Sequence, residues 1–357
     1  MNQQEKSCGE DIFDISGAEG TQHFYDGGDG DDRFVIVGQA EALINGSLGE
    51  DMIEVSSIAS STTFQIRHAD HFSRISGPAE IGFKSVEMIT GSANADEFLF
   101  IDVPFLTGVQ SIDGGDGNDL LVMTDEVHAH SAGDRYLDLT SGLYGNFTRI
   151  SGIEYVQGSR NDDHVKGNNS NNFVLAQAGA DEIRGMAGND KIYGGAGNDT
   201  LSGGAGLDSL YGDDGVDKVY GDGEDDKIYG YAGEDELYGG AGNDSLLGGA
   251  DQDKLHGEVG NDTLRAEGGI DVLAGGPGIN VLYGGDGSDT FTFGYGTDYV
   301  MDFLLGTDRL LNHDYISPSY SQSGTYVKIS GAGGTMYLAN CSLSDVQNAH
   351  DNFFLWA

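Results

Sequence analysis

A strict nine-residue period constrains this chain more than any other feature of its sequence. From residue 158 to residue 292 the sequence divides into fifteen copies of nine residues, with no insertion or deletion. Copies beginning at Gly194, Gly239 and Gly284 share the pattern G-G-x-G-x-D-x-U-x, in which U is apolar. A fixed period of this kind is typical of a solenoid, in which each repeat buries its apolar side against its neighbours.

The eighth position of every copy is apolar, from Val165 to Phe291, and its neighbours are mostly polar. This alternation predicts a very short strand, with position 8 in the core and positions 7 and 9 facing solvent. Because three residues make a strand too short to stand alone, we expect neighbouring repeats to stack.

Positions 1, 2 and 4 are mostly glycine, and position 6 is aspartate in thirteen copies and asparagine in two. Glycine allows a tight turn with positive φ and lets main-chain carbonyls approach an ion. Carboxylate and carbonyl oxygens without His or Cys favour calcium over zinc. The predicted ligands are the position-6 aspartates Asp163, Asp181, Asp190, Asp199, Asp208, Asp217, Asp226, Asp235, Asp244, Asp253, Asp262, Asp271 and Asp289, and the position-4 glycines Gly188, Gly197, Gly206, Gly215, Gly233, Gly242 and Gly260.

The charge of the chain also points to cations as partners. Its 357 residues include 59 acidic residues and only 17 Lys and Arg, for a net charge of -42. Nucleic acid and anionic membranes are therefore poor partners, and without counterions we expect disorder. The repeats hold 26 acidic and 8 basic residues, a net of -18, which on the order of ten calcium ions would offset.

The repeats resemble those of the RTX family of nonapeptide-repeat proteins, over 135 of 357 residues. The resemblance implies an all-β parallel β-roll in which two repeats make one coil, residues 18 apart stack, and calcium lies between stacked turns on one edge. Fifteen repeats then extend roughly 35 Å. Departures from the motif predict weak or empty turns at Ala176 and Ala266 (position 1), Glu224 and Asp251 (position 4), and Asn172 and Asn280 (position 6).

Residues 1–157 carry four scattered copies of the same motif. These copies keep an apolar residue at position 8 (Phe34, Ile53, Phe98 and Leu121). We interpret this segment as an irregular parallel β-roll or β-helix, with a separate β-sandwich as the alternative. Its predicted calcium ligands are Asp32, Asp51, Asp96 and Asp119.

Residues 293–357 are expected to cap the roll. Alternating stretches at Thr325 to Ile329 and Thr335 to Leu338 predict a hairpin, which would hide the last apolar rung. The acidic and then aromatic C-terminal sequence DNFFLWA resembles the uncleaved signals of type I secretion substrates, and either role, or both, would account for it. No apolar stretch has the length of a signal peptide or a membrane span, so we expect neither.

Tyrosines recur at position 9 with 18-residue spacing: Tyr193, Tyr211 and Tyr229 on one face, Tyr220 and Tyr238 on the other. They predict stacked surface ladders. Such ladders are explained by strand packing, or by sugar binding or self-association.

No H-E-x-x-H, G-x-S-x-G or P-loop motif is present. The leading hypothesis is a secreted, non-enzymatic calcium-binding protein, structural or adhesive, exported unfolded by a type I apparatus and folded outside the cell by calcium. One alternative is a secreted enzyme whose active site lies in residues 1–157. Another is a surface-layer or self-assembling extracellular protein. Cell-surface polysaccharide and further copies of the chain are the partners that these hypotheses suggest.

Overall fold

The computed structural model describes residues 151–312, 318–331 and 334–356 and, before residue 151, only the strands. The chain divides into two compact units, one of residues 1–168 with 173–175 and one of residues 169–172 with 176–357. Both consist mainly of parallel strands, so the predicted all-β solenoid is confirmed.

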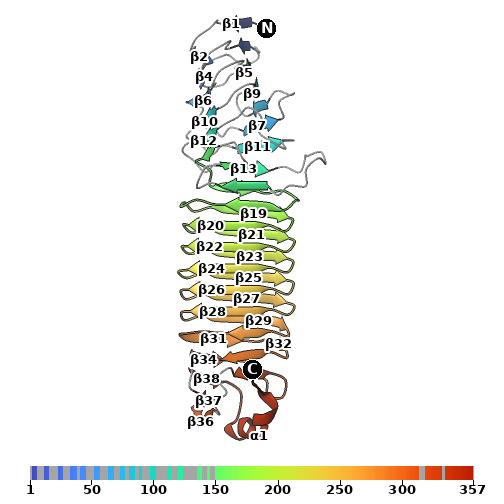
Figure 1. Ribbon diagram of the computed structural model, residues 1–357, viewed down its shortest axis with the longest axis vertical. Helices are drawn as coiled ribbons and strands as arrows, with labels where there is room; N and C mark the ends of the chain where they lie inside the picture. The colour runs from blue at the N-terminus through green and yellow to red at the C-terminus, as the bar shows by residue number, and fades with distance from the viewer. Residues whose placement is uncertain are drawn as a thin grey trace. The chain divides into compact units, whose positions relative to one another are not determined.

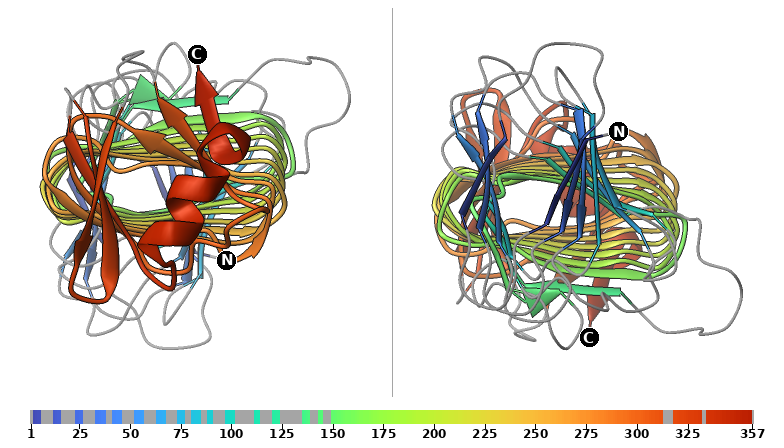
Figure 2. Two further views of the ribbon diagram at one scale, coloured as in Figure 1. Left: turned by 90° about the horizontal axis from the view of Figure 1, so that it is seen from below. Right: turned by 90° about the horizontal axis from the view of Figure 1, so that it is seen from above.

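In the second unit each repeat contributes one strand, and successive strands lie in opposite layers (Figure 1). In one layer β21 (Lys191–Ala196) pairs in parallel with β23 (Ser209–Asp214), which sets Ile192 beside Leu210. Pairing partners are thus 18 residues apart, as the resemblance implied. Figure 2 shows the two layers joined by turns at both edges. The layer of β21 and β23 continues through β25 (Lys227–Ala232), β27 (Ser245–Ala250), β29 (Thr263–Gly269), β31 (Ile279–Tyr283) and β34 (Gly296–Val300). The short strand β32 (Asp286–Gly287) pairs with β29 in the same layer. The other layer contains β20 (Glu182–Ala187), β22 (Thr200–Ala205), β24 (Lys218–Gly223), β26 (Glu236–Ala241), β28 (Lys254–Val259), β30 (Val272–Ala274) and β33 (Thr290–Phe293).

Most of these strands span six residues rather than the three that the pattern predicts. In β21 the inward-facing residues are Ile192, at position 8, and Gly194, at position 1 of the next copy. Position 1 is therefore a second buried position, which the sequence pattern did not indicate. Ala176 and Ala266, which replace the glycine there, are fully buried as well.

The eighth positions form the core, as predicted. Each of these side chains is at most 2% exposed, and burying one aliphatic side chain contributes about 1.5–3 kcal/mol. Stacking the strands is what removes them from water. The buried column in the second unit consists of Ile183, Ile192, Leu201, Leu210, Val219, Ile228, Leu237, Leu246, Leu255, Leu264, Leu273, Leu282 and Phe291.

The C-terminal residues cap the second unit, as predicted. The expected hairpin is formed by β37 (Tyr326–Ser330) and β38 (Gly334–Leu338), and Val327, Ile329, Met336 and Leu338 are fully buried. β38 also extends the layer of β34 in parallel, and Figure 2 shows the cap lying across the end of the coil. An unpredicted helix, α1 (Leu343–Phe353), follows. The other cap strands are β35 (Arg309–Asn312), β36 (Ser319–Ser323) and β39 (Phe354–Trp356).

In the first unit the four scattered copies fall on parallel strands. Phe34 lies beside Ile53, and Phe98 lies beside Leu121. This pairing is that of a β-roll rather than of an antiparallel β-sandwich. Asp32, Asp51, Asp96 and Asp119 lie outside the described residues. The strands of this unit are β1 (Asn2–Glu5), β2 (Ile12–Ile15), β3 (His23–Asp26), β4 (Arg33–Val37), β5 (Glu41–Asn45), β6 (Met52–Ser56), β7 (Thr63–Arg67), β8 (Ser73–Ser76), β9 (Glu80–Lys84), β10 (Met88–Thr90), β11 (Glu97–Ile101), β12 (Ser111–Asp113), β13 (Leu120–Met123), β14 (Arg135–Asp138), β15 (Leu143–Tyr144), β16 (Arg149–Ser151), β17 (Tyr155–Gln157) and β18 (Asp163–Lys166), with part of β19 (Phe173–Ala178).

Candidate metal centre

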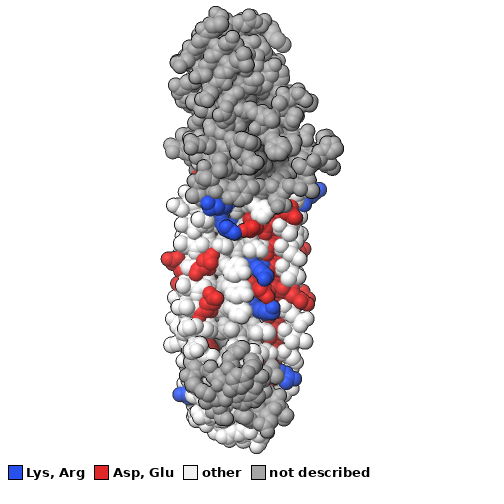
Figure 3. Space-filling view, viewed as in Figure 1, with Lys and Arg blue, Asp and Glu red and all other residues white. Residues whose placement is uncertain are grey.

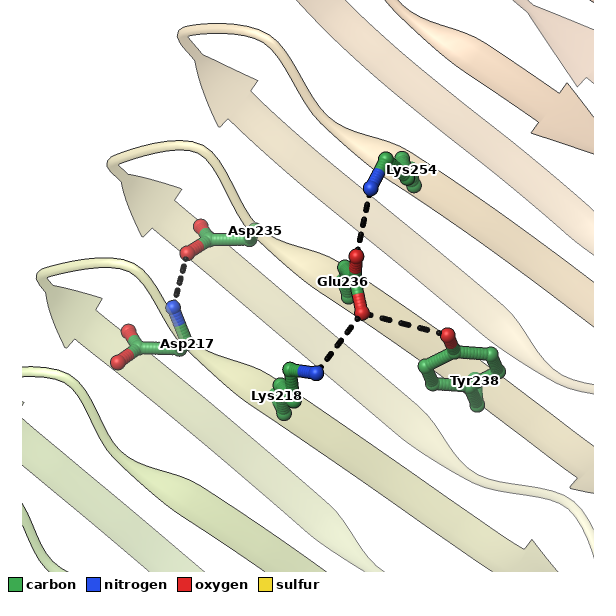
Figure 4. A network of polar contacts seen from close by, with 6 residues as sticks. All are labelled: Asp217, Lys218, Asp235, Glu236, Tyr238 and Lys254. Carbon is green, nitrogen blue, oxygen red and sulfur yellow. Dashed lines mark hydrogen bonds and ion pairs between the residues drawn. The ribbon is translucent and has the colours of Figure 1, made fainter.

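The position-6 aspartates of the second unit form a column at each edge of the roll, and each is at most 2% exposed. From Asp190 to Asp289, one carboxylate oxygen, Oδ1, accepts a hydrogen bond from the main-chain nitrogen of the position-6 residue 18 positions earlier. Figure 4 shows this bond from Asp217 N to Asp235 Oδ1, which measures 2.8 Å. The bond from Asp190 N to Asp208 Oδ1 measures 2.7 Å. Stacking of the coils thus fixes the orientation of each carboxylate.

The other oxygen, Oδ2, has no hydrogen-bond partner in ten of these buried aspartates. A buried carboxylate with an unsatisfied oxygen costs several kcal/mol unless a cation or a proton compensates it. The protein therefore presents a row of anionic oxygens that require a positive partner. The ten residues are Asp190, Asp208, Asp217, Asp226, Asp235, Asp244, Asp253, Asp262, Asp271 and Asp289.

The unpartnered oxygen faces a small space shared with the next coil. A methyl group on Gly239 would lie 2.5 Å from Asp244 Oδ2 and 2.7 Å from the carbonyl oxygen of Gly257. The same construction on Gly257 gives 2.5 Å to Asp262 Oδ2 and 2.6 Å to the carbonyl oxygen of Gly275. Glycine at position 1 therefore leaves room for a carboxylate oxygen and a carbonyl oxygen to converge, rather than supplying positive φ.

Glycine at position 4 serves both purposes that the sequence suggested, which are a positive φ and the close approach of a main-chain carbonyl. The φ angles of Gly197 and Gly215 are 145° and 152°. A methyl group on Gly215 would overlap the carbonyl oxygen of Gly197 in the coil before it. The predicted position-4 residues all have positive φ: Gly188, Gly197, Gly206, Gly215, Gly233, Gly242 and Gly260.

The position-6 aspartates of the two columns are called the ladder aspartates. Burial raises their pKa well above the ordinary value of 3.8. It raises the pKa of Asp226 to about 8, and repulsion from Asp208 and Asp244 adds to the effect. The pKa of Asp190 and that of Asp217 rise to about 7 for the same main reason. The accepted main-chain hydrogen bond opposes the rise in all three. Without metal, these sites therefore attract protons near neutral pH.

Comparison with protein families decides what these turns are. The model of the RTX calcium-binding nonapeptide repeat, in four copies, matches residues 108–122, 150–183, 175–210, 211–246, 229–264, 238–273 and 265–300. The chain contains RTX calcium-binding nonapeptide repeats. Its RTX repeats are calcium-binding repeats, and the β-roll described above is their fold.

Two further comparisons add little. No curated protein sequence matches the chain significantly. Among solved structures, the extracellular lipase LipA from Serratia marcescens aligns with 12% identity and a TM-score of 0.27, over 76% of this chain and 62% of the lipase. The alignment thus spans less than two thirds of that enzyme, and at this TM-score it has no bearing on activity.

The donors present in the RTX turns fit calcium. Each aspartate turn offers a carboxylate oxygen and main-chain carbonyl oxygens, which are hard ligands. In the described part of the chain, no three His, Cys, Asp or Glu side chains form a metal-binding group. When bound, calcium would supply the positive charge that the buried oxygens lack.

Two ladder residues beyond the last regular repeat were not predicted. Asp298 and Asp308 are buried, at 2% and 5% exposure. Residues 293–301 keep the nine-residue register, with Gly296 at position 4, Asp298 at position 6 and Val300 at position 8. Extending the period by one copy would therefore have found Asp298. Asp308 breaks the register by one residue and could not be found in this way.

The stacking expected for the tyrosines is confirmed. Ring centroids of Tyr193 and Tyr211 are 4.4 Å apart, those of Tyr211 and Tyr229 are 4.9 Å apart, and those of Tyr220 and Tyr238 are also 4.9 Å apart. Because each ring covers the face of the next, packing between coils accounts for the ladders.

Charges on the roll separate by position. Figure 3 shows acidic side chains in lengthwise rows, with fewer Lys and Arg. On one strand face, Glu236 lies between Lys218, at 3.3 Å, and Lys254, at 2.6 Å (Figure 4). The hydrogen bond from Lys254 lowers the pKa of Glu236. Exposed ion pairs of this kind contribute little to stability.

Replacing Glu224 with glycine should stabilise the protein. Glu224 stands at position 4 with φ of 70°, and its carboxylate accepts a hydrogen bond from Gly206 N at 3.1 Å. Glycine removes a left-handed strain of about 1–2 kcal/mol, while the exposed hydrogen bond that is lost contributes about 0.5–1.5 kcal/mol. We expect a gain of about 0.5 kcal/mol, measured as a higher melting temperature in calcium.

Asp251 provides the matched control for this substitution. It also replaces a position-4 glycine, but it is not among the described residues with left-handed φ. Asp251→Gly should therefore give no gain through relief of strain. A lower melting temperature for Glu224→Gly would show that the hydrogen bond outweighs the strain.

Proposed function

We propose that this chain is a secreted protein that calcium folds outside the cell, and that its role there is structural or adhesive. The observation that carries the proposal is the set of ten buried aspartates, in two columns, whose second oxygen has no hydrogen-bond partner. These buried oxygens oppose folding until cations compensate them. The match to RTX calcium-binding repeats supports calcium as that cation.

The thermodynamics favour export before folding. Extracellular calcium modules bind with dissociation constants of about 10⁻⁴ to 10⁻³ M, so their sites stay empty in the cytosol and fill outside. In the cytosol the acidic side chains, which give the chain a formal charge of -42, then repel one another. Outside the cell, the free energy of calcium binding becomes free energy of folding. A type I secretion apparatus, which we propose as the export partner, would thus receive an unfolded chain.

Circular dichroism at neutral pH, with calcium or with a chelator, tests this function. We expect strong β structure in millimolar calcium and its loss in the chelator, restored when calcium is added back. Magnesium at the same concentration is the control, because its small octahedral shell fits flexible carbonyl sites poorly. Retention of most of the β signal in the chelator would contradict the proposal.

Among the described residues, no helix has the length and apolar character needed to cross a bilayer.

A further inference from the structure

Asn280 occupies a ladder position, and its amide changes the chemistry of the turn. Its Oδ1 accepts a hydrogen bond from Asp262 N at 3.0 Å, as a ladder aspartate does. Its Nδ2 donates to Asp298 Oδ1 at 2.9 Å and to the carbonyl oxygen of Gly276 at 3.0 Å. Both polar ends of this fully buried side chain therefore have partners within the protein.

The amide nitrogen lies in the place that an unpartnered oxygen takes elsewhere. A methyl group on Gly275 would overlap both Asn280 Nδ2 and Asp298 Oδ1. The equivalent methyl group on Gly257 would lie 2.5 Å from Asp262 Oδ2. The nitrogen donates hydrogen bonds, whereas the oxygen can only accept one or bind a cation.

We propose that Asn280 replaces a calcium ion, so that the column of ligands on this edge ends at a turn closed by an amide. This inference rests on the proposed calcium-dependent folding. The missing charge at position 280 had predicted a weak or empty site. The geometry points instead to a turn that closes without metal, because the amide donates one hydrogen bond to Asp298 Oδ1 and another to the carbonyl oxygen of Gly276.

On the opposite edge, the column of aspartates ends at Asp308, whose turn is also closed by hydrogen bonds. Asp308 Oδ1 accepts a hydrogen bond from Asp289 N at 3.2 Å, and its Oδ2 accepts one from Leu304 N at 2.7 Å. Both carboxylate oxygens are used, whereas Asp289 Oδ2 has no hydrogen-bond partner. The last coil before the cap is therefore closed on both edges by hydrogen bonds that need no ion.

The test is the number of calcium ions bound by the full-length protein, measured by equilibrium dialysis and atomic emission. Asn280→Asp places a second carboxylate against Asp298, so we expect one additional ion. The calcium concentration at half-folding should also rise, roughly twofold or more, because this turn now requires calcium to close. Asp244→Asn, the opposite change inside the same column, should bind one ion fewer.

A second variant keeps the inference testable if Asn280→Asp folds poorly. Asp298→Asn retains an oxygen that can accept from Asn280, so the number of bound ions should stay that of the natural sequence. A loss of one ion in Asp298→Asn, or no additional ion in folded Asn280→Asp, would overturn the inference. If the natural sequence binds no calcium at all, it is the proposed function that fails.

Discussion

In the presence of a chelator, lowering the pH from about 8 to about 5 should increase the β structure of the protein. Burial raises the pKa of Asp226 to about 8 and that of Asp190 and Asp217 to about 7, from 3.8. Groups with a raised pKa in the folded state stabilise it fully below the unfolded pKa of 3.8, and this contribution is lost as the pH rises through the folded pKa values of about 7 to 8. Protons thus replace calcium as the compensating charge.

Calcium binding should depend on pH in the opposite sense to folding in the chelator. Because the ligand carboxylates must lose their protons, calcium affinity should fall as the pH decreases from about 8 to about 6. Isothermal titration calorimetry measures this affinity, and far-UV circular dichroism measures the folding in the chelator.

Two substitutions show whether the ladder is the source of these effects. Asp226→Asn removes a carboxylate whose pKa burial raises to about 8, so folding in the chelator should depend less on pH. Asp286→Asn, at an exposed residue, should leave the dependence unchanged. If the β signal in the chelator is no higher at about pH 5 than at about pH 8, the role assigned to the buried carboxylates is contradicted.

Replacing Gly215 with alanine should lower the free energy of unfolding in calcium by about 4 kcal/mol. Its φ of 152° lies in a region that costs other residues about 1–3 kcal/mol. The new methyl group would also overlap the carbonyl oxygen of Gly197, and overpacking typically costs about 1–3 kcal/mol. Because the obstacle is backbone of the neighbouring coil, it cannot move aside alone. Urea denaturation at saturating calcium measures the loss.

Gly268→Ala is the matched control, since a methyl group there would have no atom within 4 Å. We expect a change of no more than about 0.5 kcal/mol. Similar losses in both variants would mean that glycine matters through chain flexibility rather than through the approach of stacked turns.

Much of the fold could be predicted because a nine-residue period is visible without any long-range information. The apolar eighth position identified the core, including Leu237 and Leu273, and the sixth position identified the aspartates that are now seen to be buried. Charge and ligand type pointed to calcium before any geometry was known. The 18-residue register came from the resemblance to RTX repeats, and it is confirmed in every paired repeat strand from β20 to β30. The ligands predicted at Asp32, Asp51, Asp96 and Asp119 stay predictions.

The sequence by itself determined the repeating unit, its core residue and its acidic turn, because these depend on neighbours within nine residues. Only the tertiary structure decided which oxygen of each aspartate is held and which is left without a partner, because the held oxygen bonds to a residue 18 positions earlier. It also decided that position 1 is buried and that Asn280 closes its turn through Asp298. These features arise from contact between coils, which no single repeat contains.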